Sequence, residues 1–451
     1  MTTPPNSQYL KPQQQPEPDA LGTMRLRMQR TGQWHEGQMA GRRWPMACVS
    51  LEITQRCNLD CTLCYLSESS ESVLDFPMEE IFRRIDLIVQ HFGPGTDVQV
   101  SGGEPTLRRR DELVAIVQRL SQRGLRASLL TNGIKATRDL LAELAAAGLV
   151  DVAFHVDTTQ ERAGYASEAD LNALRLTYIE RARGLPISVF FNTTVHDGNF
   201  HEVPMLSAFF VANADAVRFA SFQLQADTGR GVMGAREGAI GNDSVASRLQ
   251  DGAGVSFRLN VLGAGHADCN RSAVLAVVNG RAYDAFDDAG FVQRFMRESA
   301  HARIDRGTCW RSIKSLLGAA LTRPGLSLAA LGWAMRLAWR MRVDLWAARG
   351  RVHKLTFFTH NFMDAKQLEH ERLEACVFMA ITHEGPLSMC AYNAQRDHFL
   401  LQPLQTPQGL WQPLRQTLRE VPIKWLKGRP RAEALNRPGR DRSPEIVESI
   451  E

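Results

Sequence analysis

Six short runs rich in β-branched and aromatic residues alternate with helical stretches between residues 48 and 224. The runs are CVSLEIT (48–54), VQVSG (98–102), ASLLTN (127–132), VDVAFHV (150–156), ISVFFNTTV (187–195) and AVRFASFQL (216–224). Strands that alternate with helices form parallel βα units with right-handed crossovers. Six units are fewer than a closed eight-stranded barrel needs. The sequence therefore predicts an α/β fold: a partial (βα)6 barrel of parallel strands with a smaller, cysteine-bearing C-terminal extension.

Changes in composition divide the 451 residues into six parts. We expect a disordered tail and linker (1–45), the barrel (46–226), a first part of the extension (227–302), a cationic Trp-rich helical segment (303–352), a second part of the extension (353–426) and a flexible tail (427–451). Within the barrel, the helix over 137–147 has clear ends. Thr137 is an expected N-cap and Gly148 an expected stop.

The net charge of +4 is too small to indicate a nucleic-acid partner, but its distribution is uneven. Between residues 303 and 351, ten Lys or Arg oppose Asp305 and Asp344, which gives +8, and the rest of the chain sums to −4. The N-terminus has no apolar run typical of a secretory signal, and no stretch approaches the 18 apolar residues of a membrane span. A cytoplasmic protein is expected, in which cysteines bind metals or react rather than form disulfides.

The segment CNLDCTLC follows the first strand and carries Cys57, Cys61 and Cys64. Clusters of the 4Fe–4S type usually take four cysteine thiolates. Three thiolates leave one iron open, so that a small molecule can chelate it. Zinc is the alternative, but a structural zinc site needs a fourth Cys or His. None lies in the loop, although His155 or a remote cysteine could fold back.

The second strand runs into VQVSGGEPT, which places Gly102, Gly103, Glu104 and Pro105 at its C-terminal end. In βα folds, functional sites gather at that edge of the sheet. Glycines allow the backbone to approach a ligand closely, and a carboxylate suits an ammonium group. A simple Gly-Gly turn is the alternative.

The cysteine loop and the GGEP sequence together resemble the radical S-adenosylmethionine (radical SAM) superfamily over about residues 46–225, with Tyr65 as the aromatic residue after the third cysteine. The resemblance implies that Cys57, Cys61 and Cys64 ligate a 4Fe–4S cluster. The free iron would bind the amino and carboxylate groups of S-adenosylmethionine, and Gly102–Glu104 would contact its amine. Reductive cleavage would give a 5′-deoxyadenosyl radical that abstracts a substrate hydrogen, with an external electron donor such as a flavodoxin or ferredoxin. This is oxidoreductase or transferase chemistry, and no catalytic residue beyond the cluster is assigned.

Other polar residues follow the remaining strands, where side chains would surround the adenosine and the substrate. For each, a hydrogen bond that ties a strand to a loop is an equal alternative. They are Thr131, Asn132 and Gly133, then His155 and Asp157, then Asn192 and Thr194, and finally Gln223 and Gln225. The expected cofactor-binding residues are Tyr65, Gly102, Gly103, Glu104, Pro105, Thr131, Asn132, Asp157 and Asn192.

Five cysteines remain, of which Cys48 is expected to be an inert core thiol. The other four, Cys269, Cys309, Cys376 and Cys390, match the ligand count of an auxiliary 4Fe–4S cluster; unpaired buried cysteines are the alternative. HNFMDAKQLEHERLEACVFMAITHEGPLSMCAYN (360–393) and the sequence around Cys269 resemble radical enzymes that include pterin-methylating enzymes and archaeal tetraether lipid synthases.

The cationic segment combines arginines with Trp310, Trp333, Trp339 and Trp346, and Pro324 divides it into two expected helices. Cationic amphipathic helices with tryptophans can lie on an anionic membrane surface. A helix pair packed over the active site is the alternative. The leading substrate is thus a lipid or hydrophobic chain, with carbon–carbon bond formation or methylation as the outcome. The alternatives are a peptide- or pterin-modifying radical enzyme and a non-enzymatic iron–sulfur or zinc scaffold.

Overall fold

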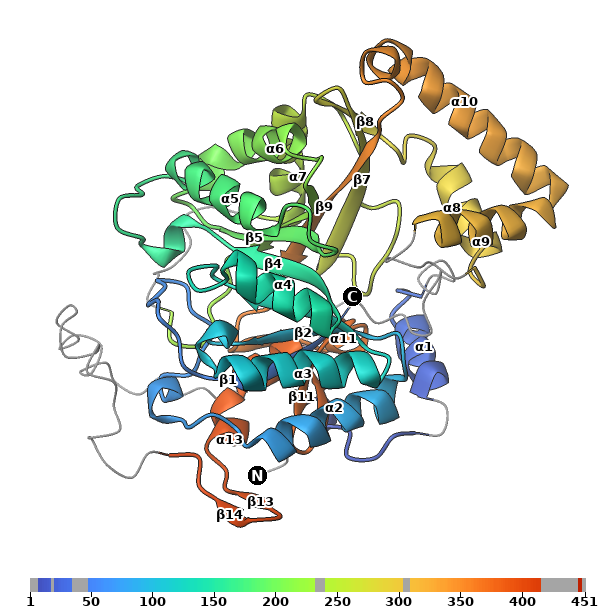
Figure 1. Ribbon diagram of the computed structural model, residues 1–451. Helices are drawn as coiled ribbons and strands as arrows, with labels where there is room; N and C mark the ends of the chain where they lie inside the picture. The colour runs from blue at the N-terminus through green and yellow to red at the C-terminus, as the bar shows by residue number, and fades with distance from the viewer. Residues whose placement is uncertain are drawn as a thin grey trace.

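One sheet of eleven strands runs through the computed structural model, which describes residues 7–17, 20–34, 48–231, 240–302, 309–414 and 445–447. The strand order is β12-β11-β1-β2-β3-β4-β5-β6-β9-β7-β8, and the sheet curves around an open interior (Figure 1). Its middle six strands pair parallel in chain order. They are β1 (Cys48–Thr54), β2 (Asp97–Gly102), β3 (Arg126–Thr131), β4 (Leu149–His155), β5 (Ser188–Val195) and β6 (Val217–Leu224). The predicted partial barrel is confirmed.

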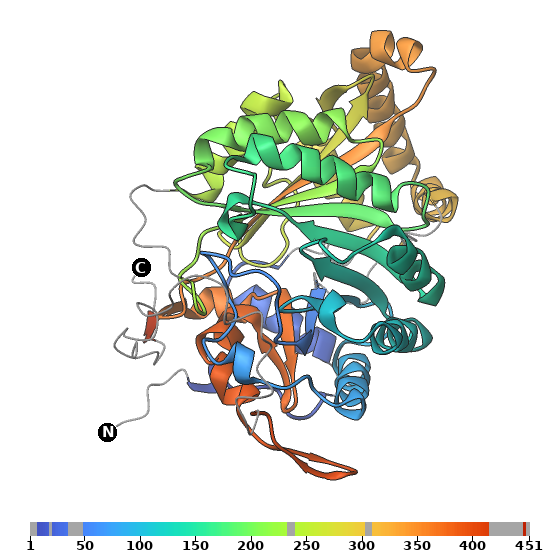
Figure 2. The ribbon, with the colours of Figure 1, turned by 60° about the vertical axis from the view of Figure 1, so that its left-hand side comes forward.

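The crossover helices cover the outer face of the sheet (Figure 2). They are α2 (Met78–Phe92), α3 (Arg110–Gln122), α4 (Arg138–Ala147), α5 (Glu168–Ala182) and α6 (Val203–Ala212), with α7 (Asn242–Ala253) packed on α6. The ends of α4 are as expected, since Thr137 accepts a hydrogen bond from the Leu140 N–H and Gly148 adopts a φ of 108°. Between sheet and helices lies a core in which Phe154, Phe191 and Phe222 are almost completely buried. Short 3-10 helices are η1 (Ser7–Leu10), η3 (Ser70–Ser72), η4 (Pro105–Leu107), η5 (Thr158–Gln160) and η6 (Phe200–Glu202).

The C-terminal extension lengthens the barrel sheet at both edges. Beyond β6 follow β9 (His353–Asn361), β7 (Asn270–Val278) and β8 (Arg281–Asp284), and beyond β1 follow β11 (Phe378–Thr382) and β12 (Gly385–Ser388). The helices of this region are α8 (Ala289–Glu298), α11 (His370–Glu374), α12 (Met389–Ala394) and α13 (Arg396–Leu400). The short strands β10 (Gln367–Glu369) and β15 (Glu445–Val447) pair, as do β13 (Leu404–Thr406) and β14 (Gly409–Trp411). Barrel and extension therefore share one sheet.

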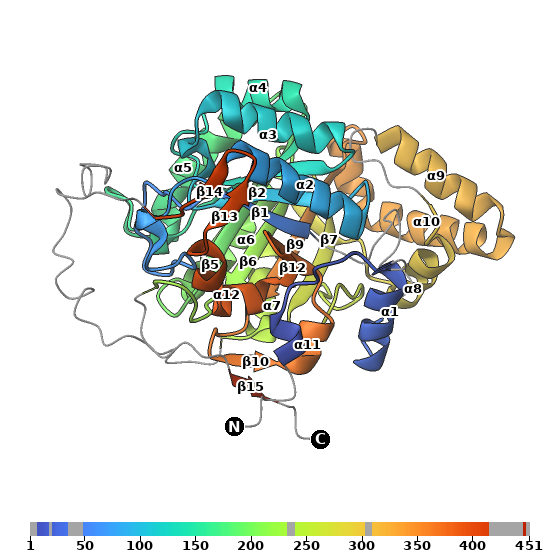
Figure 3. The ribbon, with the colours of Figure 1, turned by 90° about the horizontal axis from the view of Figure 1, so that it is seen from below.

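The cationic segment forms two helices, α9 (Cys309–Leu321) and α10 (Pro324–Ala347), separated at Pro324 as expected. In α10 the proline stands in the first turn, where its missing N–H costs nothing. Both helices lie beyond the β8 edge and diverge from the turn that joins them, and α10 packs on α8, α9 and β7 (Figure 1 and Figure 3). Within the described part of the chain, no helix is long and apolar enough to span a bilayer.

The N-terminal segment differs from the expected disordered tail. Residues Ala20–Arg30 form helix α1, and Met28 is fully buried against Ala375 and Val377. Met24 stands four residues earlier and packs against the same cluster, so the helix has an apolar face. The Pro- and Gln-rich composition of the residues before the helix gives no sign of that face. The expected flexible tail at 427–451 lies outside the described residues, apart from β15.

Candidate functional site

Three thiols gather in the loop after β1. Cys57, Cys61 and Cys64, called here the first trio, form no disulfide, and each is partly exposed. Burial raises the pKa of Cys57 to about 11 and the pKa of Cys61 well above its ordinary value, and the negative charges of the neighbouring thiolates act in the same direction. Because each thiolate opposes the ionisation of the next, the loop needs a cation before three thiolates can coexist.

Arg230, which the sequence analysis did not single out, lies against this loop. Its Nε donates to the Cys64 Sγ at 3.4 Å, and its backbone N–H donates to the Leu66 carbonyl at 2.8 Å. An added Cβ on Gly229 would lie 2.2 Å from the Tyr65 carbonyl carbon, so the chain after β6 packs directly on the cysteine loop. Arginine N–H groups beside cluster sulfurs stabilise their negative charge.

The GGEP sequence is fastened to the same loop. The Gly103 and Glu104 N–H groups donate to the carbonyls of Thr54 and Arg56 at 2.8 and 2.7 Å. The Tyr65 hydroxyl donates to the Gly102 carbonyl at 2.5 Å. Glycine is required at both 102 and 103, because an added Cβ would come within 2.2 Å of a backbone carbonyl oxygen of Thr54 or Arg56. Pro105 begins η4, one residue beyond this contact.

Glu104 is completely buried and holds neighbouring strand ends through its carboxylate. Its Oε1 accepts from the N–H and hydroxyl of Thr106 and from the hydroxyl of Thr131 at 2.7 Å. Its Oε2 accepts from the Asn132 N–H at 2.7 Å. A carboxylate oxygen accepts about two hydrogen bonds, so Oε2 alone retains capacity for an ammonium group. Asn132 also donates from Nδ2 to Asn58 within the cysteine loop at 2.7 Å.

The polar residues predicted at the ends of β4, β5 and β6 form one hydrogen-bonded ring. Asp157 contacts the His155 Nε2 at 2.7 Å and accepts from the Thr194 N–H at 2.8 Å. Burial alone would raise the pKa of Asp157, but the His155 charge and these hydrogen bonds hold it well below its ordinary value. Asn192 lies 3.4 Å from both the His155 Nδ1 and the Gln223 Oε1. Gln225, by contrast, is tied through its backbone N–H, which donates to Val195.

Aromatic rings line the same inner face of the sheet. Phe191 packs under the outer helices, and side chains alternate along a strand, so Phe190 and Asn192 face the interior. The Phe190 ring lies 5.1 Å from that of Phe219, which lies 5.4 Å from Phe358. Further contacts extend this inner aromatic row toward the C-terminal extension, through His360, Phe362 and Phe378.

Three further cysteines, called here the second trio, come together from distant parts of the sequence. They are Cys269 before β7, Cys376 after α11 and Cys390 in α12. Burial raises the pKa of each, to about 11 for Cys376, and the charges of Cys269 and Cys376 add to the effect on Cys390. Arg372 donates from Nε to the Cys269 Sγ at 3.2 Å, which repeats the arrangement of Arg230 and Cys64.

A buried polar cluster connects α12 to the barrel. The Tyr392 hydroxyl donates to Glu52 of β1 at 2.9 Å, and Arg396 forms an ion pair with the same carboxylate. The Arg396 guanidinium lies 4.9 Å from the centre of the Tyr65 ring. Burial would raise the pKa of Glu52, yet Arg396 and the hydrogen bonds hold it below its ordinary value. The second trio is thus braced against the loop that carries the first.

The remaining cysteines are placed as follows. Cys48 begins β1, on the strand that precedes the cysteine loop. Cys309 is the first residue of α9, but its side chain lies outside the described part of the chain, so its role as a ligand stays a prediction.

The spacing of the trios bears on the choice between zinc and iron–sulfur. Among the described residues, no three His, Cys, Asp or Glu are arranged to hold a single metal ion. The thiols of each trio nevertheless influence one another through their charges. A 4Fe–4S cluster is larger than one ion and is held by thiolates that stand further apart, so thiols that form no single-ion site are compatible with a cluster.

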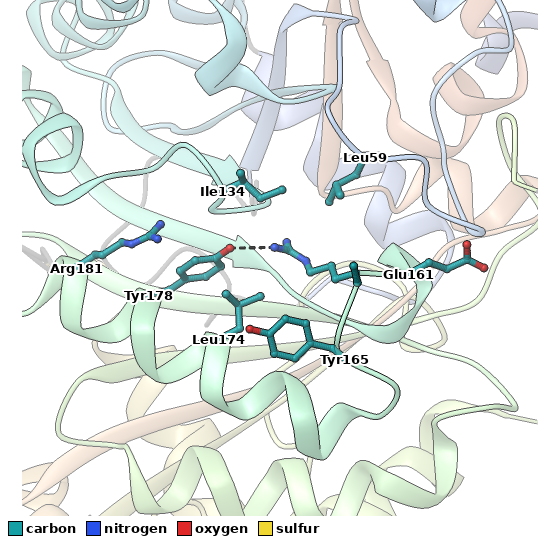
Figure 4. Close-up of a pocket in the computed structure, with 9 residues that line it drawn as sticks. Leu59, Ile134, Glu161, Tyr165, Leu174, Tyr178 and Arg181 are labelled. Carbon is teal, nitrogen blue, oxygen red and sulfur yellow. Dashed lines mark hydrogen bonds between the residues drawn. The ribbon is translucent and has the colours of Figure 1, made fainter. Parts of the chain in front are cut away.

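A pocket of about 390 Å³ lies beside the cysteine loop, on the outer rim of the barrel (Figure 4). Leu59 of the loop and Ile134 form one wall, and Tyr165, Leu174 and Tyr178 form the other. Arg162 donates to the Tyr178 hydroxyl at 2.9 Å across its floor. The pocket is separate from the ring of polar residues at the strand ends, which does not contribute to its lining.

Residues 51–206 match the family model described as the Radical SAM superfamily. For residues 51–206, this match confirms the superfamily that the cysteine loop and the GGEP sequence predicted. It ends before β6 and does not include the C-terminal extension.

Named enzymes are among the proteins similar to this chain. One is 7,8-dihydro-6-hydroxymethylpterin dimethyltransferase of Methanocaldococcus jannaschii, 29% identical over 188 residues, which are 40% of this chain and 37% of the relative. Another is a PqqA peptide cyclase of Bradyrhizobium diazoefficiens, 33% identical over 189 residues, which are 40% of this chain and 47% of the relative. The chain thus spans less than half the length of either.

Among solved structures, SuiB of Streptococcus suis bound to S-adenosylmethionine is similar over 42% of this chain and 44% of that chain. The sequence identity is 14% and the TM-score is 0.34. A likeness this distant says nothing about activity, and the barrel assignment rests on the strand order.

Proposed function

We propose that this chain, whose residues 51–206 belong to the radical SAM superfamily, binds a 4Fe–4S cluster through Cys57, Cys61 and Cys64 and uses it to cleave S-adenosylmethionine. One observation supports this above all: three cysteine thiols share one loop, and an arginine N–H is directed at the sulfur of Cys64. The same loop is fastened to the GGEP sequence, which leaves one acceptor position on Glu104. Protein ligands number three, so one iron is left for the methionine amine and carboxylate.

When bound, the reduced cluster supplies one electron that splits S-adenosylmethionine into methionine and a 5′-deoxyadenosyl radical, which takes a hydrogen atom from the substrate. The residues of the chain position the reactants. Arg230 offsets thiolate charge, and Glu104 fixes Thr131 and Asn132 at the mouth of the barrel. His155 and Asn192 offer hydrogen bonds to the ribose or the substrate from the inner face. The external electron donor, such as a flavodoxin or ferredoxin, belongs to the same proposal.

The second trio is proposed to hold an auxiliary 4Fe–4S cluster. Cys269, Cys376 and Cys390 converge from three elements that are far apart in the sequence, and Arg372 donates to the first of them. The other nitrogens of Arg372 bind Glu369 and the Asn361 carbonyl, which holds its Nε toward Cys269, where it would offset the charge of a thiolate. Cys309 or an exogenous group would supply the fourth ligand.

For the substrate, we favour a compact polar ring system, such as a pterin or the side chain of a peptide, over a lipid. The two relatives are named for a pterin and a peptide. The inner aromatic row supplies rings for stacking, and His155, Asn192 and Gln223 supply hydrogen bonds beside it. A hydrocarbon chain would exclude water from these side chains and offer no hydrogen bond to the donors and acceptors that their bonds to one another leave unused.

A lipid substrate remains the second candidate, since α9 and α10 expose apolar side chains that suit a membrane surface. Deuterium transfer separates the candidates. A compound whose deuterium appears in 5′-deoxyadenosine is a substrate. If a deuterated acyl chain labels 5′-deoxyadenosine and deuterated pterins and peptides do not, the lipid replaces the polar ring system as the first candidate.

Anaerobic reconstitution with iron and sulfide tests the cluster assignments. The intact chain is expected to bind about eight irons and to form 5′-deoxyadenosine on reduction. Cys61→Ala should form no 5′-deoxyadenosine. Cys376→Ala should bind about four irons fewer and still form some 5′-deoxyadenosine, and Cys48→Ala should resemble the wild type. Stoichiometric zinc without cleavage of S-adenosylmethionine would instead indicate the non-enzymatic scaffold.

A further inference from the structure

Helix α10 presents a continuous apolar stripe to solvent. Six large side chains recur every three or four residues, which places them on one face of the helix over about 27 Å. Leu328 is 71% exposed and Trp346 is 89% exposed. The stripe consists of Leu328, Leu331, Met335, Trp339, Val343 and Trp346.

The opposite face of α10 is anchored, so the direction of the stripe is fixed. Leu337 and Met341 are buried with Val278 of β7 in a separate small core. The Trp333 ring stacks at 5.5 Å on Phe291 of α8, and its Nε1 donates to a backbone carbonyl. Figure 1 shows α10 projecting beyond the edge strand β8, away from the barrel. The stripe is therefore an outward surface of a rigidly attached helix.

Helix α9 carries a second stripe of the same kind. Trp310, Ile313, Leu317 and Leu321 follow the same spacing, and Trp310 is 70% exposed. The two helices contact each other and diverge from the turn that joins them (Figure 1). The stripe of α10 alone gathers more exposed large apolar side chains than the scattered ones of an ordinary monomer.

The charge around the stripes is mostly positive, although Arg336 and Arg340 form ion pairs with Asp288 and Asp287. Residues 309–351 contain eight Lys or Arg and a single acid, Asp344. That acid is buried and accepts hydrogen bonds from Tyr283 and Asn279, so it does not offset charge on the outer face. Arg342, which interrupts the apolar pattern, lies 4.4 Å from the Trp339 ring centre. A long cationic side chain stacked on tryptophan can place its stem in an apolar phase and its head in a polar one.

We propose that the surface formed by α9 and α10 binds the face of an anionic lipid bilayer. Apolar side chains with tryptophan at the margins and arginine alongside match the boundary between acyl chains and headgroups. Neither helix spans a membrane, so the contact is peripheral. A second copy of the chain fits less well, because two cationic surfaces would repel each other.

Vesicle co-sedimentation of the full chain tests the proposal independently of catalysis. The wild type should bind vesicles of phosphatidylglycerol and phosphatidylcholine, bind weakly to phosphatidylcholine alone, and lose binding as salt rises. The double variant Trp339→Ser, Trp346→Ser should lower the partition coefficient about tenfold or more. The matched variant Leu176→Ser, Leu410→Ser removes exposed apolar side chains elsewhere and should bind as the wild type does.

Light scattering on the same samples measures whether the chain forms a dimer, and together with the partition coefficients it gives the results that would overturn the proposal. A dimer that forms through Trp339 and Trp346 without vesicle binding would overturn the proposal and assign the surface to a second copy. Equal partition of the wild type and the double variant would also overturn it. Both tryptophans are exposed, so an unchanged circular dichroism melt is expected and shows that loss of binding is not loss of fold.

Discussion

Replacing Gly103 with alanine tests the close contact between the GGEP sequence and the cysteine loop. The new Cβ would lie 2.2 Å from the Arg56 carbonyl oxygen, whereas real Cβ atoms essentially never come nearer than 3.0 Å. The GGEP sequence and the backbone at Arg56 must therefore separate by roughly 0.8 Å, the difference between these distances. The obstacle is backbone rather than a flexible side chain, so it cannot move aside cheaply. Two hydrogen bonds at this contact, from the Gly103 and Glu104 N–H groups, would lengthen.

The expected loss combines overpacking of about 1–3 kcal/mol with weakening of two hydrogen bonds at about 1 kcal/mol each. We expect urea unfolding to show a decrease of about 3–5 kcal/mol, and displacement near the reactants to slow formation of 5′-deoxyadenosine about 100-fold. Gly318→Ala is the control, since nothing lies within 4 Å of its Cβ position in α9. It should be neutral or stabilising by about 0.5–1 kcal/mol. If Gly103→Ala kept wild-type stability, iron content and cleavage rate, the argument from this contact would be refuted.

Three further predictions each concern one side chain. Arg230→Gln removes a positive charge beside the Cys64 sulfur, so the reduction potential of the first cluster should fall in a spectroelectrochemical titration; an unchanged potential would contradict the assignment. Glu52→Gln breaks the buried pair with Arg396 and should cost about 3–5 kcal/mol in urea unfolding, and a loss under about 1 kcal/mol would show that the pair is not isolated from water. Burial lowers the pKa of His91 below 6.5, so the unfolded chain binds that proton more readily and stability falls as pH drops below 6.5. His91→Gln should remove this term, at most about 1.4 kcal/mol per pH unit, and equal slopes for both proteins between pH 6.5 and 5 would argue against it.

Local sequence was sufficient for the barrel and for the first trio. Alternating strands and helices are set by nearby residues, as the cap at Thr137 and the stop at Gly148 illustrate. The three cysteines of the first trio lie within one loop, so their spacing alone defines a candidate site. For Glu104 the position was correctly placed at a strand end, but its network with Thr131 and Asn132 was not foreseen, because those donors come from the next strand.

The two arginines could not be predicted in the same way. Arg230 is separated from Cys64 by 166 positions, and Arg372 from Cys269 by 103. Nothing in the residues around an arginine distinguishes a partner of a thiolate from an ordinary surface charge. The one usable signal was the glycine on each side of Arg230, since glycines in a loop after a strand indicate close backbone approach.

The inner aromatic row shows a different limit of local pattern. On β5, Phe190 and Phe191 read as one apolar run, although one ring faces the interior and the other faces the helices. Strand periodicity separates the two faces but does not say which face another layer covers. The crossover helices cover the outer face. Strand β9, which lies more than 160 residues further along the chain, completes the inner face. The ring of Phe358 on β9 continues the row begun by Phe190 and Phe219, so the proposed substrate surface exists only once barrel and extension have joined in one sheet.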